Sequence, residues 1–303
     1  MSAPVAVVHL VRHANGLEPL DTFLTSYTRH DAGCEHDLVL LCKGFADADA
    51  LAAVRARARE LAAHEITVPD VGLDLTAYLA AARALPHERL CFVNSYSEIL
   101  APDWLALLCA PLGAQRAGAA AASGSWASRR SFVLSLLRLP NGYRGTLGDR
   151  RLMTPALRSV STAPKVGPVR RLMRAAADVP AQLATYPGFP APHLRTNAFA
   201  IGRELLLSLK AGTLETKNAT YRFEAGRSSL TAQLGARRLT AVVVGRDGDA
   251  RTSGSWPDAD VFWQGDQSQL LVADNQTRQY QDASPLVREA LARFAWGPRA
   301  RPG

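Results

Sequence analysis

Short apolar runs alternate with longer amphipathic stretches over the first 125 residues of the chain. In chain order these segments are VAVVHLV, LEPLDTFLTSYTRH, DLVLLC, DADALAAVRARARELAAH, EITVP, LTAYLAAARAL and RLCFVN. Continuous Val and Leu runs separated by helical patterns are typical of parallel strands that helices cover on both faces. The pattern therefore predicts a doubly wound α/β fold, in which ligands bind at the carboxyl ends of the strands.

The pattern changes in the second half of the chain. A small-residue stretch, AGAAAASGSWAS, suits a further strand and loop, and the Arg-, Gly- and Pro-rich residues 129–174 predict mostly loop. Beyond about residue 180, isolated strands and helices are expected in NAFAIGRELLLSL, RRLTAVVVGR, QLLVAD and PLVREALARFAW. We expect residues 1–128 and 129–303 to form the two halves of one continuous domain.

Composition excludes several classes of protein. The 303 residues are 48% hydrophobic, which is enough to bury a sizeable core and too much for a disordered chain. No run of 18 apolar residues occurs and the first residues lack a secretion signal, so we expect a cytoplasmic location. The four cysteines lack C-x-x-C spacing, and three lie in apolar runs, which predicts small buried residues in a reducing compartment.

The formal charge of +8 is concentrated in one segment. Residues 129–174 hold 11 basic side chains and one acidic side chain, whereas residues 1–128 hold 9 and 14. Within GPVRRLMRAAADV, apolar residues at helical spacing are flanked by Arg170, Arg171 and Arg174. Such a stripe can lie peripherally on an anionic membrane, or it can be an ordinary packed helix. The segment has few aromatics and no nucleic-acid motif, so no nucleic-acid partner is expected.

Two phosphate-binding patterns are absent, and a third is incomplete. No G-x-G-x-x-G follows a strand and no G-x-x-x-x-G-K-[ST] occurs. Arg12 and His13 in LVRHAN resemble the start of the histidine phosphatases, whose chemistry also needs a second histidine after a late buried strand. The only histidine beyond residue 87 is His193, which lies in a proline-rich stretch. A polar pair that closes the first strand is the competing interpretation.

Polar side chains gather where the predicted strands end. The fourth strand, RLCFVN, is followed by Asn94, Ser95, Tyr96 and Glu98. Asp70 and Asp74 in PDVGLDLTAYL lie at the mouth of the third strand and at the start of the next helix, where Asp74 could also be an N-cap.

The order of these elements resembles the GT-A glycosyltransferases, in particular the family 2-like enzymes. The resemblance covers roughly residues 5–235. It rests on HDLVLLCKGF, DVGLDLTAYL, CFVNSYSEILAPDWL, HLRTNAFAIGRELL and RFEAGRSSLT. It implies a GT-A-like (Rossmann-like) mixed sheet, mostly parallel and flanked by helices. It also implies a nucleotide diphosphate sugar as donor.

In that family the motif after the fourth strand is usually D-x-D, and its carboxylates hold Mg²⁺ or Mn²⁺ on the diphosphate. Here Asn94, Ser95 and Tyr96 stand in its place. Two alternatives follow. Glu98 holds the metal together with the Asn and Ser oxygens, or basic residues such as Arg12 or Arg195 replace the metal. Glu98 as a plain acid at a helix start is the structural alternative.

The resemblance also implies a late acidic residue that takes the proton from the attacking hydroxyl. Glu224 in RFEAGRSSLT is the best match, expected on a loop beside Gly226, although pairing with Arg222 or Arg227 would make it a surface residue. The stretch from His193 to Asn197 resembles the lining of the sugar pocket, with Arg195 and Asn197 on hydroxyls or diphosphate. Asn197 is also a plausible turn residue.

Polar and aromatic residues near the end of the chain suit recognition of an acceptor sugar. They are Asp274, Asn275 and Gln276 in VADNQTRQY, and Trp263 and Asp266 in FWQGDQ.

The sequence thus predicts transfer of a sugar from a nucleotide diphosphate sugar to a hydroxyl of a saccharide or lipid-linked saccharide, as in polysaccharide biosynthesis. The predicted donor ligands are Asp70, Asp74 and residues 94–98. Two alternatives stay open: a GT-A-like domain that binds a glycan or nucleotide without turnover, and a histidine phosphatase.

Overall fold

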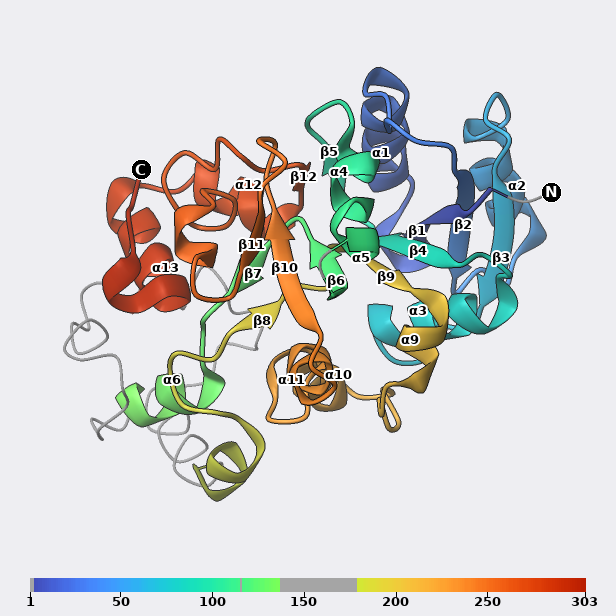
Figure 1. Cartoon of the computed structure of the whole chain (residues 1–303). Coiled ribbons are helices and arrows are strands. Elements are labelled where there is room, and N and C mark those ends of the chain that lie inside the picture. Colours follow the sequence, from blue (N-terminus) through green and yellow to red (C-terminus); the bar gives the residue numbers. More distant parts are fainter. Residues whose placement is uncertain (1–2, 115, 137–178) are drawn as a thin grey trace.

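A computed structural model describes residues 3–114, 116–136 and 179–303 of the chain (Figure 1). The strands of the main sheet are β1 (Val5–Arg12), β2 (Asp37–Lys43), β3 (His64–Val68), β4 (Arg89–Val93), β6 (Ala117–Ala121), β9 (Ala198–Gly202), β10 (Thr240–Val244) and β11 (Ala250–Thr252). Two small sheets pair β5 (Glu98–Ile99) with β12 (Val272–Ala273), and β7 (Gly124–Ser125) with β8 (His193–Leu194). Most of the basic segment, including Arg170, Arg171 and Arg174, lies outside the described residues.

The main sheet has eight strands in the order β11-β10-β6-β9-β4-β1-β2-β3. Six of them run in one direction, while β9 and β11 run antiparallel to their neighbours. At its centre, Val8 of β1 pairs with Val39 of β2 and with Phe92 of β4. The predicted fold class is therefore confirmed: an α/β protein with a mixed, mostly parallel sheet that helices flank. Strands from both predicted halves belong to this one sheet.

Helices cover both faces of the sheet (Figure 1). The helices up to residue 136 are α1 (Glu18–Arg29), α2 (Ala48–Arg57), α3 (Asp74–Ala84), α4 (Trp104–Cys109), α5 (Pro111–Ala114) and α6 (Arg129–Leu136). Those that follow are α9 (Arg203–Ser208), α10 (Lys217–Ala225), α11 (Leu230–Ala236), α12 (Asn275–Gln281) and α13 (Pro285–Trp296). Among the described residues, no helix is both long enough and apolar enough to cross a bilayer.

The two faces bury separate apolar clusters, because side chains alternate along each strand. On β1, Val7 belongs to the cluster beneath α1 and α4, whereas Val8 belongs to the cluster beneath α3. Cys42, Cys91 and Cys109 are buried, as the sequence predicted, and all four cysteines are free.

The order of the parallel strands changes direction between β1 and β4. From β1 the chain passes through β2 to β3 at one edge, and then returns to β4 on the other side of β1. In α/β sheets such a switch point leaves a crevice at the carboxyl ends of the strands. The segment that leads into the antiparallel β9 reaches the same edge, since Asn94 at the end of β4 donates its backbone N–H to Asn197 O at 2.8 Å.

His9 in the middle of β1 is a buried polar residue. Its ring stacks on Phe23 of α1 with ring centroids 3.7 Å apart, and neither ring nitrogen forms a hydrogen bond with the described part of the chain. Burial lowers the pKa of His9 from 6.5 to about 3. Between about pH 3 and 6.5, His9 therefore binds a proton in the unfolded chain but not in the folded chain. The free energy of unfolding thus falls as the pH drops below 6.5.

We predict that lowering the pH from 7 to 5 costs the wild type about 2 kcal/mol more free energy of unfolding than it costs a His9→Leu variant. Urea unfolding of both proteins at the two pH values measures this difference. Equal pH dependence in the two proteins would show that His9 does not carry the effect.

Candidate functional site

A cavity of about 220 Å³ lies at the carboxyl edge of the parallel strands, next to the switch point. Its walls come from the start of α3, the end of β4, the segment before β9, α10 and the start of α12. Five of the residues that the sequence singled out for the donor, the sugar pocket and the general base line it together: Asp74, Asn94, Arg195, Asn197 and Glu224. The structure thus brings together residues that are up to 150 positions apart.

Gly72 shapes the loop between Asp70 and Asp74. Its φ of +66° lies in the left-handed region, and a Cβ there would come within 2.7 Å of the Leu214 carbonyl oxygen and would overlap Thr76. Only glycine adopts this conformation at little cost. The turn leaves Asp70 behind β3 and makes Asp74 the first residue of α3, after the N-cap Leu73. The alternative prediction of Asp74 as the N-cap is therefore wrong.

Arg12, Lys43 and Asp70 form a charged cluster at the ends of the first three strands. Arg12 donates to both carboxylate oxygens of Asp70, at 3.1 and 3.0 Å, and lowers the pKa of Asp70. The buried Lys43 Nζ lies 3.5 Å from Asp70 Oδ1 and donates to the Gly72 carbonyl oxygen at 2.6 Å. The sequence analysis did not predict a role for Lys43, although a lysine at the end of an apolar strand indicates a buried, paired cation.

Asp74 and Glu224 are the carboxylates of the cavity that have no salt-bridge partner among the described residues. Burial raises the pKa of Asp74, and the charge of Glu224 raises it further, while Lys43 opposes the shift. Both carboxylates line the cavity, and the charge of Glu224 acts on Asp74.

Glu224 is fixed by Thr196. Its Oε1 accepts hydrogen bonds from the Thr196 backbone N–H and hydroxyl, both at 3.0 Å, and its Oε2 has no hydrogen bond within the described part of the chain. The prediction of a loop is wrong, because Glu224 lies in the last turn of α10, which Thr216 caps at its start and Gly226 ends. No pairing with Arg222 or Arg227 occurs among the salt bridges that the structure describes.

His193 lies behind this wall and is not part of the cavity lining. It is buried, and its Nδ1 is 2.8 Å from the Ala191 carbonyl oxygen, so Nδ1 carries the proton in the neutral ring. Burial lowers the pKa of His193, while the charge of Glu224 opposes the shift. These contacts make His193 a neutral packing residue in this structure.

Arg195 is buried with all its main contacts inside the protein. Its guanidinium donates to Asp274 Oδ2 at 2.6 Å, Gln276 Oε1 at 3.0 Å and Ser123 Oγ at 3.1 Å, and it lies 3.9 Å from the centroid of the Phe262 ring. Asp274 also caps α12 through its other oxygen. Arg195 therefore joins three segments at the floor of the cavity.

Asn197 offers an unused donor to the cavity. Its Oδ1 accepts from the Ser123 hydroxyl at 3.0 Å, but its Nδ2 has no partner among the residues that the structure describes, and the residue is only 6% exposed. An unpaired buried amide costs stability, so such a group is typical of a site that a ligand completes.

The segment after β4 forms a tight turn. Asn94 Oδ1 accepts from the Tyr96 backbone N–H at 3.1 Å and from the Ser97 hydroxyl at 3.0 Å. Ser95 is buried and Tyr96 is 37% exposed, and neither lines the cavity. Glu98 pairs with Arg278 of α12, with Glu98 Oε2 and Arg278 Nη1 3.3 Å apart.

The residues present do not fit the predicted Mg²⁺ or Mn²⁺ site. Glu98, the predicted metal ligand, is engaged by a cation. Within residues 3–114, 116–136 and 179–303, no group of three or more His, Cys, Asp or Glu side chains is placed to hold a metal ion. We therefore derive no step through a metal.

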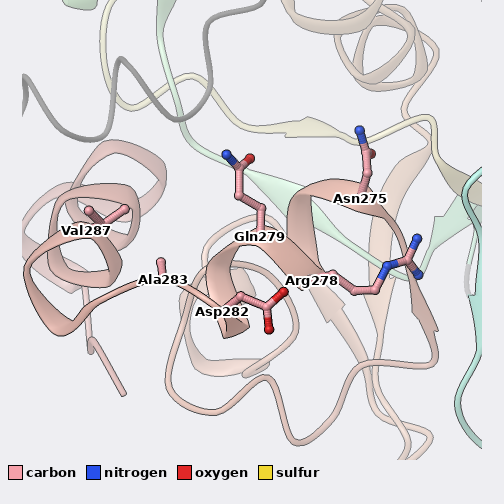
Figure 2. A pocket seen from close by; sticks show the side chains of 6 residues that line it. All are labelled: Asn275, Arg278, Gln279, Asp282, Ala283 and Val287. Carbon is pink, nitrogen blue, oxygen red and sulfur yellow. The ribbon is translucent and has the colours of Figure 1, made fainter.

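A second, more open hollow of about 540 Å³ lies beside the first, over α12 and α13 (Figure 2). Arg278, Gln279, Asp282 and Val287 contribute to its lining, and Asn275 lines both hollows. Of the predicted acceptor residues, Asp274, Asn275 and Gln276 line the smaller cavity, whereas Trp263 is buried and donates to the Gln276 carbonyl oxygen at 3.1 Å.

No protein-family model matches the chain, and a search of curated proteins finds no match. Similar solved structures include a glucosyl-3-phosphoglycerate synthase from Mycobacterium tuberculosis in complex with Mn²⁺, UDP and glucosyl-3-phosphoglycerate. It is 17% identical, with 68% of this chain and 59% of that chain covered and a TM-score of 0.36. This chain thus spans about three fifths of the synthase's length.

Two further structures are a mannosyltransferase from Pyrobaculum calidifontis in complex with GDP-Man and Mn²⁺, and TarS from S. aureus in complex with UDP-GlcNAc. The mannosyltransferase is 14% identical, with 97% of this chain and 70% of that chain covered and a TM-score of 0.46. For TarS the identity is 15%, the covered shares are 40% and 34%, and the TM-score is 0.32.

We predict that Gly72→Ala lowers the free energy of unfolding by roughly 3 kcal/mol, because left-handed strain adds to the overlap with Thr76 and Leu214. Gly212→Ala is the matched control: its φ is +64°, but nothing lies within 4 Å of the added Cβ, so only about 1 kcal/mol is expected. Chemical denaturation measures both. Equal costs would show that the crowding around Gly72 is unimportant.

Proposed function

We propose that this protein is a glycosyltransferase that moves a sugar from a nucleotide diphosphate sugar to a hydroxyl of a saccharide or lipid-linked saccharide. The observation that carries the proposal is the gathering of Asp74, Asn94, Asn197 and Glu224 in one cavity beside the switch point of the sheet. These residues belong to the segments on which the resemblance to the GT-A enzymes rests. The cavity offers oxygen acceptors and an unpaired amide donor, the groups that recognise sugar hydroxyls.

The contacts of Glu224 support a role as general base. Two donors from Thr196 fix Oε1, which leaves Oε2 as the acceptor for the proton of an incoming hydroxyl. As that proton moves to Glu224, the hydroxyl oxygen bonds to the anomeric carbon. The bond between that carbon and the phosphate oxygen breaks, and its electron pair leaves with the nucleoside diphosphate.

Asp74 and Asn197 suit the binding of the sugar. Asp74 has no salt-bridge partner among the described residues, so its carboxylate oxygens can accept hydrogen bonds from sugar hydroxyls. Asn197 lines the same cavity, and its Nδ2, which has no hydrogen-bond partner among the described residues, can supply a donor.

The phosphatase alternative gains no support from the geometry. Arg12, which would grip the phosphate, gives Nε and Nη2 to Asp70. His13 lies in an exposed short helix and contacts the Phe45 ring edge-on at 5.1 Å.

We expect UDP or GDP to stabilise the protein against thermal unfolding. A ligand that binds only the folded state at 100 times its Kd adds about 2.7 kcal/mol. A thermal shift series with both nucleotides, with uridine and guanosine as controls without phosphate, measures the effect. No shift with any nucleoside diphosphate, with or without Mn²⁺, would contradict the proposal.

We predict that Glu224→Gln keeps nucleotide binding and lowers sugar transfer by about 10²- to 10⁴-fold, since the amide still accepts from Thr196 but cannot take a proton. Release of nucleoside diphosphate from the donor that the wild type consumes is the measurement. Glu215→Gln, an exposed acid just before α10, is the matched control. Unchanged transfer in Glu224→Gln rejects the base assignment, and no transfer by the wild type with any donor would favour the non-catalytic alternative.

A further inference from the structure

The turn after β4 lacks the carboxylates that would hold a metal on a diphosphate. Asn94 and Tyr96 stand at the two positions where the resemblance implies acids, and the nearby Glu98 is paired with Arg278. The positive charge beside this turn is thus the guanidinium of Arg278.

Arg278 reaches the turn from a helix 180 residues away in sequence. Its Nη2 donates to the Tyr96 carbonyl oxygen at 2.9 Å, and its Nη1 lies 3.3 Å from Glu98 Oε2. Figure 2 shows the side chain extending from α12 away from Ala283 and Val287. The Arg278 side chain is 34% exposed, so a ligand from solvent can reach it.

Among the described residues, the other cations at this edge hold a carboxylate more closely or are more buried than Arg278, although the Arg12 side chain is as exposed (35%) as that of Arg278 (34%). Arg12 holds Asp70 through two hydrogen bonds, and Lys43 is 1% exposed with two partners of its own. Arg195 is buried by three polar partners and the Phe262 ring. Arg278 instead meets Glu98 through one long contact, and a guanidinium has five N–H donors to offer.

We propose that Arg278 binds the diphosphate of the donor in the place where related enzymes use a divalent metal. The inference rests on the proposed function. A guanidinium matches phosphate oxygens with two parallel hydrogen bonds, and these charge-assisted bonds are stronger than neutral ones. On binding, the phosphate replaces the single contact with Glu98, while the bond to Tyr96 O keeps Arg278 beside the turn.

The position of α12 supports this role. Asn275, in the first turn of α12, lines the cavity that holds Asp74 and Glu224, and Arg278 follows one turn later. A diphosphate on Arg278 would thus lie next to the cavity that is proposed to take the sugar. Asp274 fixes the start of this helix through its cap and its pair with Arg195.

Isothermal titration with UDP and GDP tests the proposal on the full chain. We expect the wild type to bind in EDTA as tightly as in Mn²⁺. Arg278→Gln should weaken binding about 10- to 100-fold in both buffers, since hydrogen bonds to charged groups contribute about 1.5–3 kcal/mol. Arg278→Lys, which keeps the charge but loses the fork of donors, should be intermediate.

Arg299→Gln is the matched control. Arg299 also forms a partly exposed pair, with Asp258 at 2.7 Å, but it lines neither hollow, so its loss should leave nucleotide affinity unchanged. Thermal unfolding of each variant without nucleotide shows whether it is folded as the wild type is.

Glu98→Gln distinguishes binding of the diphosphate by Arg278 from binding by a metal that Glu98 holds. If Arg278 binds the diphosphate, this variant binds in EDTA at least as tightly as the wild type, because a competing anion is gone. Binding that requires Mn²⁺ and is lost in Glu98→Gln overturns the role of Arg278 and leaves the proposed function standing, as does unchanged affinity in folded Arg278→Gln. If no nucleoside diphosphate binds the wild type in any buffer, the proposed function itself fails.

Discussion

The buried ion pair between Arg195 and Asp274 ties together the parts of the chain that form the site. It joins the segment before β9 to the start of α12, and Ser123 after β6 completes it. A charge that is 1% exposed is costly unless it is paired, so removing either partner would leave a charge stranded inside the protein. The position of Asn197, the floor of the cavity and the direction of α12 all depend on this pair.

A second buried cation fixes the opposite wall. Lys43 holds Asp70 and the Gly72 carbonyl, and the left-handed Gly72 then sets Asp74 at the start of α3. In both walls a buried cation is neutralised by a carboxylate and therefore organises the backbone. This leaves Asp74 and Glu224 facing the cavity, with the partly exposed Arg278 beside it. The buried ion pairs thus hold the backbone in place, and the groups that keep free donors or acceptors are left to contact a ligand.

Local pattern predicted the fold and half of the site, for a physical reason. Strand and helix periodicity is a local property, and the ends of parallel strands meet at one edge, so Asp74 and Asn94 could be placed together from sequence. The insertion of the antiparallel β9 between β4 and β6 and the pairing of Glu98 with Arg278 depend on contacts far apart in the chain. No local pattern encodes such contacts. The sequence analysis did not select Thr196, because only its neighbours Arg195 and Asn197 matched the sugar-pocket stretch. Glu224 was predicted on a loop because the nearby Gly226 suggested a turn, whereas Gly226 ends α10 just after it.

The central claim is that this edge of the sheet binds the diphosphate of a sugar nucleotide through protein groups alone. A crystal structure grown with UDP or GDP in the presence of EDTA tests it most directly. We expect a nucleotide at the carboxyl ends of the strands, with phosphate oxygens within hydrogen-bonding distance of Arg278 and the terminal phosphate pointing toward Glu224. A nucleotide bound elsewhere, or at this edge without contact to Arg278, would contradict it.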